Sequence, residues 1–443
     1  MPYRGNIAKQ HVRLANRVHA LFGLVRYTIR MKGGAVMSQS PVAAKPAEST
    51  TEHRKLAREL VAQAHRADGL APLDIERFHH DQAIAAANPF GEHIPQVALG
   101  IPMNWECVFD ELNVSPDPWR FLNDTEWANG LIDAYNDKAE RIVGRRILNR
   151  RGQADEQDTF PPYKQLHDIF EARNVWHGDS WWLQQSAHTE AELEALLDRV
   201  DRRLENLREF MLPPSWDERK GQLLSRGISP HLYKHQRGPV TFATSIYGAE
   251  NLLYLIMLNP PLAARLRDTI VRAMLGMHEV LLGESEWDDP AATRGFSFCD
   301  DNCCLLNPEM YEFFGYPILK AVFDRCSPDP GDWRYQHSDS DMAHLLPILS
   351  RLDFSRVNFG PTLTVSQIRE HMPRTVIEGQ LAPFTFSRNE EVNIVGELLR
   401  DIEMAREKRG LLFATAGSVN NGSRLSGLRL IMAGIQKYGR IDD

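Results

Sequence analysis

The sequence predicts an α/β protein folded as a (β/α)8 barrel, a TIM barrel, with an N-terminal helical extension. Three observations lead to this prediction. In the C-terminal half, short apolar or β-branched runs alternate with helix-patterned segments, as in parallel sheets with right-handed crossovers. The predicted strands number about eight, which a closed barrel requires. Polar residues follow almost every strand-like run, as they do at the carboxyl-terminal mouth of such a barrel.

Length and composition agree with this fold class. The chain has 443 residues, of which 43% are hydrophobic and 25% charged, which is ordinary for a globular protein. A barrel of roughly 250 residues with insertions therefore fits. The five cysteines are too few and too irregular for a disulfide scaffold, which favours free thiols and a cytoplasmic protein. No apolar run approaches the roughly 18 residues of a membrane span.

Residues 1–51 differ from the rest of the chain. They begin with a basic, partly amphipathic stretch and continue with the Ser-, Pro- and Ala-rich sequence MSQSPVAAKPAEST. We predict a disordered extension, and favour an upstream extension with Met37 near the natural start over a targeting or membrane-surface segment. The barrel domain is expected at 52–443, with helical insertions at about 104–235. From residue 33 on, 44 basic residues face 59 acidic ones, which argues against nucleic acid as a partner.

The elements before residue 237 are less regular than those after it. A charged helix is expected at 52–71, and a first strand in IPQVALGIPM at 94–103. Helices follow at 124–147 and 190–211, with a candidate eighth strand near Val175. Three tryptophans gather near that strand, and we favour core packing for them over a pocket for a flat ligand.

From residue 237 onward the alternation is clear. Strands are predicted at 238–245, 295–300, 333–337, 354–361, 374–381 and 410–417. Helices are predicted at 248–258, 261–282, 308–325, 342–352, 365–371, 390–406 and 425–438.

In a parallel barrel the strand ends converge on one mouth, so the residues there are the candidate site. These residues are Asn104, Trp105, Ser245, Tyr247, Asp300, Asp301, His337, Asp339, Asn358, Phe359, Glu378, Gln380, Thr415 and Ser418. The acids and the histidine are candidate catalytic groups, and the amides, aromatic residues and Ser418 are candidate substrate-binding groups.

The junction after the 333–337 strand carries the strongest signal. The H-x-D spacing of His337 and Asp339 lets both side chains reach one metal ion, with Glu378 as a third ligand from a neighbouring strand. Alternatively, His337 is a general acid held by a carboxylate. A third interpretation is that Asp339 or Asp341 simply caps the next helix and His337 is a satisfied, partly buried histidine.

Asp300 and Asp301 end another strand. One of them is a candidate acid/base or substrate-binding group, and a turn with an Asx-type cap is the alternative.

The chain also resembles the uroporphyrinogen decarboxylase superfamily. The resemblance covers residues 237–438 and lies in five segments, RGPVTFATSIYGAENLL, FCDDNCCLLNPEMYEFF, HSDSDMAHLLPILSRLDFSRVNFGP, IREHMPRTVIEGQLAP and LLFATAGSVNNGS. It implies a (β/α)8 barrel with the site at its carboxyl-terminal mouth.

The family has two main branches, and the sequence departs from both. The decarboxylases remove acetate carboxyls from a tetrapyrrole without a cofactor; their R-Q-A-G-R-type stretch is missing here, and their last-strand-loop histidine falls on Gly417. The cobalamin- and coenzyme M-type methyltransferases bind zinc through H-x-C and a later cysteine. Here His337 matches the first ligand, Asp339 replaces the first cysteine and Gly417 the later one. Carboxylate in place of thiolate favours harder ions.

The resemblance therefore implies a methyltransferase-like enzyme that moves a methyl group from a small or aromatic donor to a corrinoid, folate or thiol acceptor. The candidate cofactors are a divalent metal, zinc or a harder ion, and a corrinoid or tetrahydrofolate. The alternatives are a cofactor-free decarboxylase of uroporphyrinogen or a related aromatic acid, and a non-catalytic tetrapyrrole- or corrinoid-binding protein. The expected partners are a small-molecule substrate, a corrinoid protein and a second copy of the chain in a homodimer.

Overall fold

The computed structural model describes residues 49–152, 158–178, 180–285, 287 and 290–441. Its main feature is a seven-stranded sheet with the order β1-β9-β8-β7-β6-β5-β4, in which every neighbouring pair is parallel. The strands are β1 (Ala98–Leu99), β4 (His235–Arg237), β5 (Phe296–Cys299), β6 (Arg334–Ser338), β7 (Arg356–Phe359), β8 (Val376–Leu381) and β9 (Leu411–Thr415). The predicted parallel α/β sheet is thus confirmed.

The predicted closed barrel is not found. In the described residues β1 and β4 are the two edges of the sheet, and no ladder joins them. The candidate eighth strand near Val175 lies in β2 (Arg173–His177), which pairs antiparallel with β3 (Ser180–Gln184) in a separate hairpin. Gly178, directly after β2, has φ +57°, and Gly-Asp between two strand-like runs is a hairpin signal in the sequence that explains this local pairing.

The predicted strand at 238–245 is also wrong, because this segment forms helix α11 (Pro239–Tyr247) directly after β4. Its β-branched and aromatic content suggested a strand. Pro239 at the first helical position starts the helix, and the buried Asp300 carboxylate accepts a hydrogen bond from Thr241 N at 2.8 Å. Tertiary contacts therefore override the strand propensity.

Most other predicted elements are present. The helices of the N-terminal part are α2 (Thr51–Arg66), α3 (Ile75–Ala87), α4 (Cys107–Leu112), α5 (Pro118–Asn123), α6 (Thr125–Val143), α7 (Leu166–Ile169), α8 (Glu190–Glu205), α9 (Leu207–Met211) and α10 (Trp216–Leu224). Those after α11 are α12 (Ala249–Leu258), α13 (Pro260–Glu284), α14 (Pro290–Thr293), α15 (Pro308–Phe313), α16 (Gly315–Cys326), α17 (Leu346–Leu349), α18 (Val365–His371), α19 (Pro383–Ser387), α20 (Glu391–Ala405) and α21 (Leu425–Tyr438). Short 3-10 turns η2 (Asp301–Leu305), η3 (Ala343–Leu345) and η4 (Ser350–Leu352) complete the set.

Some predicted helices are broken. The segment 308–325 divides into α15 and α16, 190–211 divides into α8 and α9, and 342–352 is three short turns rather than one helix. In contrast, α18 and α21 have the predicted bounds. The N-terminal helix α2 packs against α20. No helix in the described part of the chain is long and apolar enough to cross a membrane.

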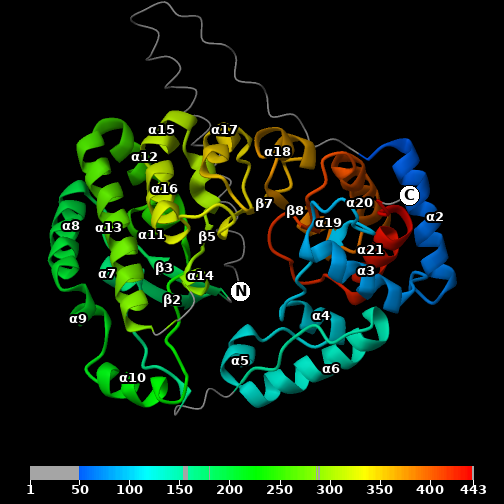
Figure 1. The fold of residues 1–443 in the computed structure, drawn as a ribbon, viewed down its shortest axis with the longest axis horizontal. Coiled ribbons are helices and arrows are strands. Elements are labelled where there is room, and N and C mark those ends of the chain that lie inside the picture. Colours follow the sequence, from blue (N-terminus) through cyan, green and yellow to red (C-terminus); the bar gives the residue numbers. More distant parts are fainter. Residues whose placement is uncertain (1–48, 153–157, 179, 286, 288–289, 442–443) are drawn as a thin grey trace, which may run out of the picture. The chain divides into compact units, whose positions relative to one another are not determined.

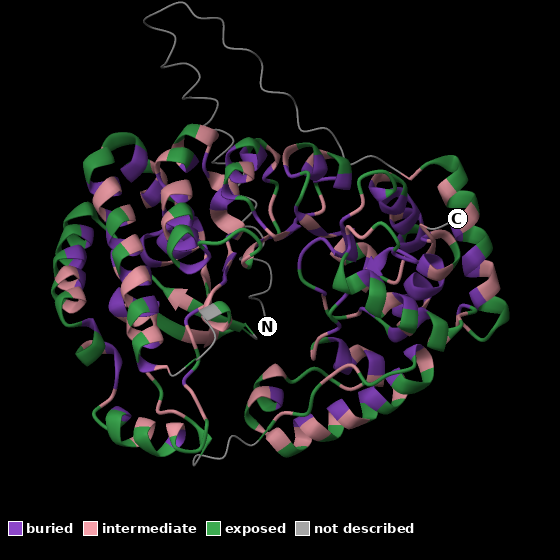
Figure 2. Ribbon diagram, in the orientation of Figure 1, coloured by how far each residue is buried: buried purple, intermediate pink, exposed green. Residues whose placement is uncertain are grey.

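The two faces of the sheet differ. Figure 1 shows α16, α17, α18 and α20 on the outer side of the strands, where Phe298 of β5 packs edge-on against Phe323 of α16. Burial alternates along β5 and β6, so the face turned away from these helices is more accessible there. In Figure 2 the buried residues of the helices lie mainly toward the strands. The side chains of β5 to β8 on the accessible face are mostly polar, namely Ser297, Cys299, Tyr335, His337, Arg356, Asn358 and Glu378, whereas β9 adds the apolar Leu412 and Ala414. Barrel interiors are normally filled by branched apolar residues, so this polar face is suited to hold a ligand.

Candidate metal centre

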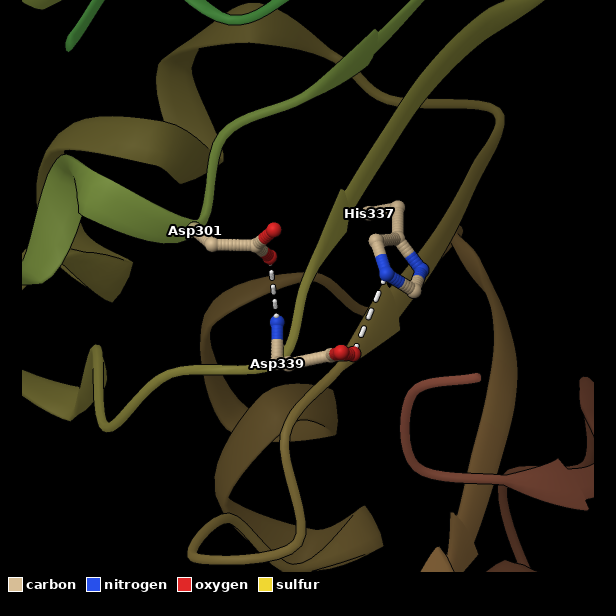
Figure 3. Close-up of side chains that lie close together, drawn as sticks. All are labelled: Asp301, His337 and Asp339. Carbon is tan, nitrogen blue, oxygen red and sulfur yellow. Dashed lines mark hydrogen bonds and ion pairs between the residues drawn. The ribbon is translucent and has the colours of Figure 1, made fainter. Parts of the chain in front are cut away.

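The site begins where β5 and β6 end side by side. Cys299 pairs in register with His337, so the residues that follow the two strands are also neighbours. Asp301 follows β5 and Asp339 follows β6, and both reach the space beside His337 (Figure 3). One ligand atom from each of the three side chains lies within 4.8 Å of the other two. The fold thus brings one imidazole and two carboxylates together.

Hydrogen bonds hold this cluster in place. His337 Nε2 lies 3.0 Å from Asp339 Oδ1, and Asp339 N donates to Asp301 Oδ1 at 2.8 Å. The Ser340 hydroxyl donates to the carbonyl oxygen of Asp301. Asp301 is therefore positioned by a backbone N–H and a hydroxyl of the loop after β6, and the Asp339 carboxylate by His337.

The pKa of His337 is raised above its usual 6.5 by its surroundings. Burial lowers the pKa, but the hydrogen bond and charge of Asp339 and the charge of Asp301 raise it by more. Without a metal ion, an imidazolium of His337 therefore balances part of the charge of the two carboxylates.

The residues fit a divalent cation. Two carboxylates supply two negative charges, and imidazole with carboxylate oxygens is a ligand set shared by zinc and harder ions such as Mn²⁺. The side chain of Asp339 is 49% exposed and that of His337 16% exposed, which leaves one side open for a substrate. The cluster therefore offers a divalent cation three protein ligands and one open position.

Two glycines make room for Asp339. A Cβ at Gly417 would lie 2.2 Å from Asp339 Oδ1, and a Cβ at Gly360 would lie 2.5 Å from the carbonyl oxygen of Asp339. Gly417 also has φ +111°, a conformation that favours glycine. The Asp339 carboxylate therefore occupies the space that a side chain at residue 417 would need.

Glu378 does not take the place predicted for it. Its carboxylate forms an ion pair with Arg356 (2.6 Å) and accepts a hydrogen bond from the Tyr335 hydroxyl (3.2 Å). Among the described residues Asp301, not Glu378, completes the group of three with His337 and Asp339. His337 and Asp339 are thus brought together as predicted, with Asp301 as the third member of the group, and Glu378 lies outside it.

A cavity of about 180 Å³ adjoins the cluster. It is lined by Gly100, Pro102, Tyr335, His337, Asn358, Glu378, Ala414, Thr415, Gly417, Ser418 and Val419. Five predicted site residues, His337, Asn358, Glu378, Thr415 and Ser418, thus line one space. Its size suits a small substrate group.

Asn358 has a structural role in this wall. Its amide nitrogen donates to the carbonyl oxygens of Glu378 and Thr415, each at 2.8 Å, and its oxygen accepts from Gly417 N at 3.0 Å. One side chain therefore joins β7, β8 and the loop after β9 that carries Ser418.

The other predicted residues lie outside the cluster. Asp300 is fully buried behind it, and Gln380 is buried and donates to the carbonyl oxygens of Gly360 and Leu363. Tyr247 is in the core, and Trp105 stacks on Phe121. A buried group without access to the cavity cannot contact a substrate there.

Asn104 lies near the mouth, where it donates to the carbonyl oxygen of Val419 at 3.0 Å. It therefore fixes the loop that lines the cavity.

The tryptophans predicted to be in the core are partly exposed. Trp181 and Trp182 are 49% and 57% exposed. Trp176 contacts Trp181 and also Trp119 of α5, with ring centroids 5.4 and 5.2 Å apart. Arg237 was not among the predicted site residues, because the strand predicted at 238–245 begins three residues after β4 does; this arginine pairs in register with Cys299.

Comparisons with known proteins give limited information. No protein-family model matches the chain, and no curated protein matches it. Among solved structures the chain is similar to a methyltransferase from Methanosarcina mazei, with 14% sequence identity and a TM-score of 0.47 over 81% of this chain and 98% of that one. A likeness of this extent says nothing about substrate or reaction. The fold and the site define an α/β protein with a polar sheet face and a candidate metal centre at the strand ends.

Proposed function

We propose that this protein is an enzyme that transfers a methyl group from a small donor, using a divalent cation held by Asp301, His337 and Asp339. The observation that supports it best is the meeting of these three ligand groups, within 4.8 Å, beside a cavity of about 180 Å³. The acceptor in this proposal is a corrinoid, a folate or a thiol.

The side chains have separate roles. Asp301 and Asp339 supply negative charge, and neutral His337 supplies a nitrogen ligand. Glu378, held by Arg356 and Tyr335, forms the wall of the cavity opposite the loop after β9. When bound, a divalent cation supplies Lewis acidity that polarises the atom from which the methyl group departs.

Decarboxylation is the weaker candidate because of Gly417. The decarboxylases that the chain resembles carry a histidine at this point. Here a side chain would overlap the Asp339 carboxylate, since its Cβ would lie 2.2 Å from Oδ1. His337, in contrast, matches the first metal ligand of the methyltransferase branch.

The first prediction concerns metal content. We expect purified protein to bind about one divalent cation, and His337→Ala and Asp301→Asn each to weaken binding by at least about tenfold, because each removes one of three ligands. Measurement by metal analysis after dialysis, and by titration of the stripped protein with Zn²⁺ and Mn²⁺, checks this.

The matched control is Asp341→Asn. Asp341 is an exposed acid two residues from Asp339 that contacts Thr362 instead of the cluster. It should retain wild-type binding. Metal content that is unchanged in both ligand variants would contradict the proposal.

The second prediction concerns pH. A metal ion and a proton compete for His337, and the carboxylates raise its pKa above 6.5. Cation affinity should therefore fall as the pH is lowered through this raised pKa and level off above it. Titrations between pH 5.5 and 8.5 measure this, in steps of about half a pH unit. In His337→Ala the part of the pH dependence that falls near neutrality should disappear.

A further inference from the structure

A second cavity lies beside the open edge of the sheet, outside the metal centre. It has a volume of about 450 Å³ and lies between β4, α11 and the β2–β3 hairpin. Arg237 and Gln236 of β4, Phe242 of α11, and Asn174, Trp181 and Leu183 of the hairpin contribute to its lining. With His167, which also lines it, the walls combine one guanidinium, one imidazole, two amides and apolar or aromatic surface, which is the usual composition of a site for an organic ligand.

Arg237 is the charged group of this cavity. It is half-buried, and its hydrogen bond goes to a neutral group, the Ser245 hydroxyl, at 3.5 Å. Among the described residues no carboxylate forms an ion pair with it, whereas Arg356 of β7 is paired with Glu378. A partly buried guanidinium with a neutral partner retains donors for a carboxylate ligand, which it binds through two parallel hydrogen bonds.

Trp181 supplies a flat wall. Its side chain is 49% exposed, and Trp176 and Trp119 contact it edge-on or tilted, at centroid distances of 5.4 and 6.4 Å. Neighbouring aromatic rings fix its orientation while its face remains accessible. Exposed, ordered aromatic surface next to an unpaired cation favours a planar ring that carries a negative charge.

Arg237 of this cavity and His337 of the candidate metal centre lie on the same face of the sheet. Arg237 pairs with Cys299, and Cys299 with His337, so the three side chains leave the same face of the sheet. Two strand spacings separate Arg237 from His337, roughly 10 Å. A ring with a carboxylate at one end can therefore reach from Arg237 toward the cation site.

We propose that the cavity between β4, α11 and the β2–β3 hairpin binds an aromatic carboxylate, with its carboxylate on Arg237 and its ring against Trp181. This inference rests on the proposed function only in naming the bound molecule as the substrate of the metal centre. The binding itself requires Arg237 and Trp181, not the cation.

Calorimetric titration with three probes tests the proposal. Benzoate should bind, whereas benzamide, which has the same shape but no charge, and cyclohexanecarboxylate, which has the charge but no flat ring, should each bind at least about tenfold more weakly. Equal affinity for benzoate and benzamide would overturn the role of Arg237. Since this comparison uses the wild-type protein, it does not depend on the folding of any variant.

Variants locate the site. Arg237→Gln should weaken benzoate binding at least about tenfold, and Trp181→Leu several-fold. The matched control is Trp182→Leu, because Trp182 is the next residue of β3, is similarly exposed, at 57% against 49%, and points to the other face of the hairpin. Equal loss in the two tryptophan variants, or none in Arg237→Gln, would overturn the assignment.

The experiment also separates this inference from the proposed function. Benzoate binding should persist in His337→Ala and in protein stripped of metal. If metal binding fails while benzoate binding shows the expected pattern, the proposed function is wrong and the carboxylate site stands. The reverse result would leave the metal centre and remove the carboxylate site.

Discussion

Gly417→Ala is expected to weaken cation binding by about 10–100-fold, although residue 417 is not a ligand. The added Cβ would lie 2.2 Å from Asp339 Oδ1, so the carboxylate must leave the position in which it contacts His337. The positive φ of +111° adds backbone strain of about 1–3 kcal/mol. Metal titration and chemical denaturation of the variant measure the two effects.

Gly331→Ala is the matched control for the strain. Gly331 also has a positive φ, +92°, but a Cβ there would meet nothing within 4 Å. Its variant should lose stability and keep full cation affinity. If Gly417→Ala lost no more affinity than Gly331→Ala, the packing of Asp339 against residue 417 would not control the site.

Asp300→Asn is expected to stabilise the protein above neutral pH. Asp300 is completely buried, and burial, with a smaller contribution from the charge of Asp301, raises the pKa of its carboxyl from 3.8 to about 7. Between these two values the folded state holds a proton that the unfolded state has lost. The free energy of unfolding therefore falls as the pH rises through this window, by on the order of 2–4 kcal/mol in total.

Asparagine keeps the shape of Asp300 and can still accept the hydrogen bond from Thr241 N, but it carries no charge. The variant should thus show a flatter dependence of stability on pH between about 4 and 7 and exceed the wild type at pH 8. Urea denaturation at several pH values measures this, with Asp341→Asn as an exposed control that keeps the wild-type slope. Parallel pH profiles for wild type and Asp300→Asn would show that Asp300 is not the group responsible.

Asp300 and Asp301 show how much of the candidate site the sequence predicts. Both follow β5 and both were predicted as catalytic candidates. Their side chains alternate, so one enters the core beneath α11 and the other faces His337. Sequence alone does not show which is which, because the Gly238–Pro239 turn that encloses Asp300 lies about 60 residues earlier in the chain; a Cβ at Gly238 would fall 2.1 Å from that of Asp300.

Glu378 shows a second limit. Like His337, it lies in the carboxyl-terminal part of a predicted strand, and for this reason it was predicted as the third metal ligand. In the structure its carboxylate forms an ion pair with Arg356 on the neighbouring strand, at 2.6 Å, and lies outside the group formed by Asp301, His337 and Asp339. The distance between Arg356 and Glu378 along the sequence does not predict this ion pair, because the pair depends on how β7 and β8 are aligned in the sheet.

The sequence by itself determined the alternation of strands and helices from β5 to α21 and the position of His337 and Asp339 at a strand end. These features depend on local periodicity, on capping and on the order of elements, which are all properties of neighbouring residues. The tertiary structure alone decided that 238–245 is mostly helix, and that Asp301 rather than Glu378 lies beside His337 and Asp339. Each of these depends on which distant groups bury or neutralise a side chain, and such long-range contacts have no signature in local sequence.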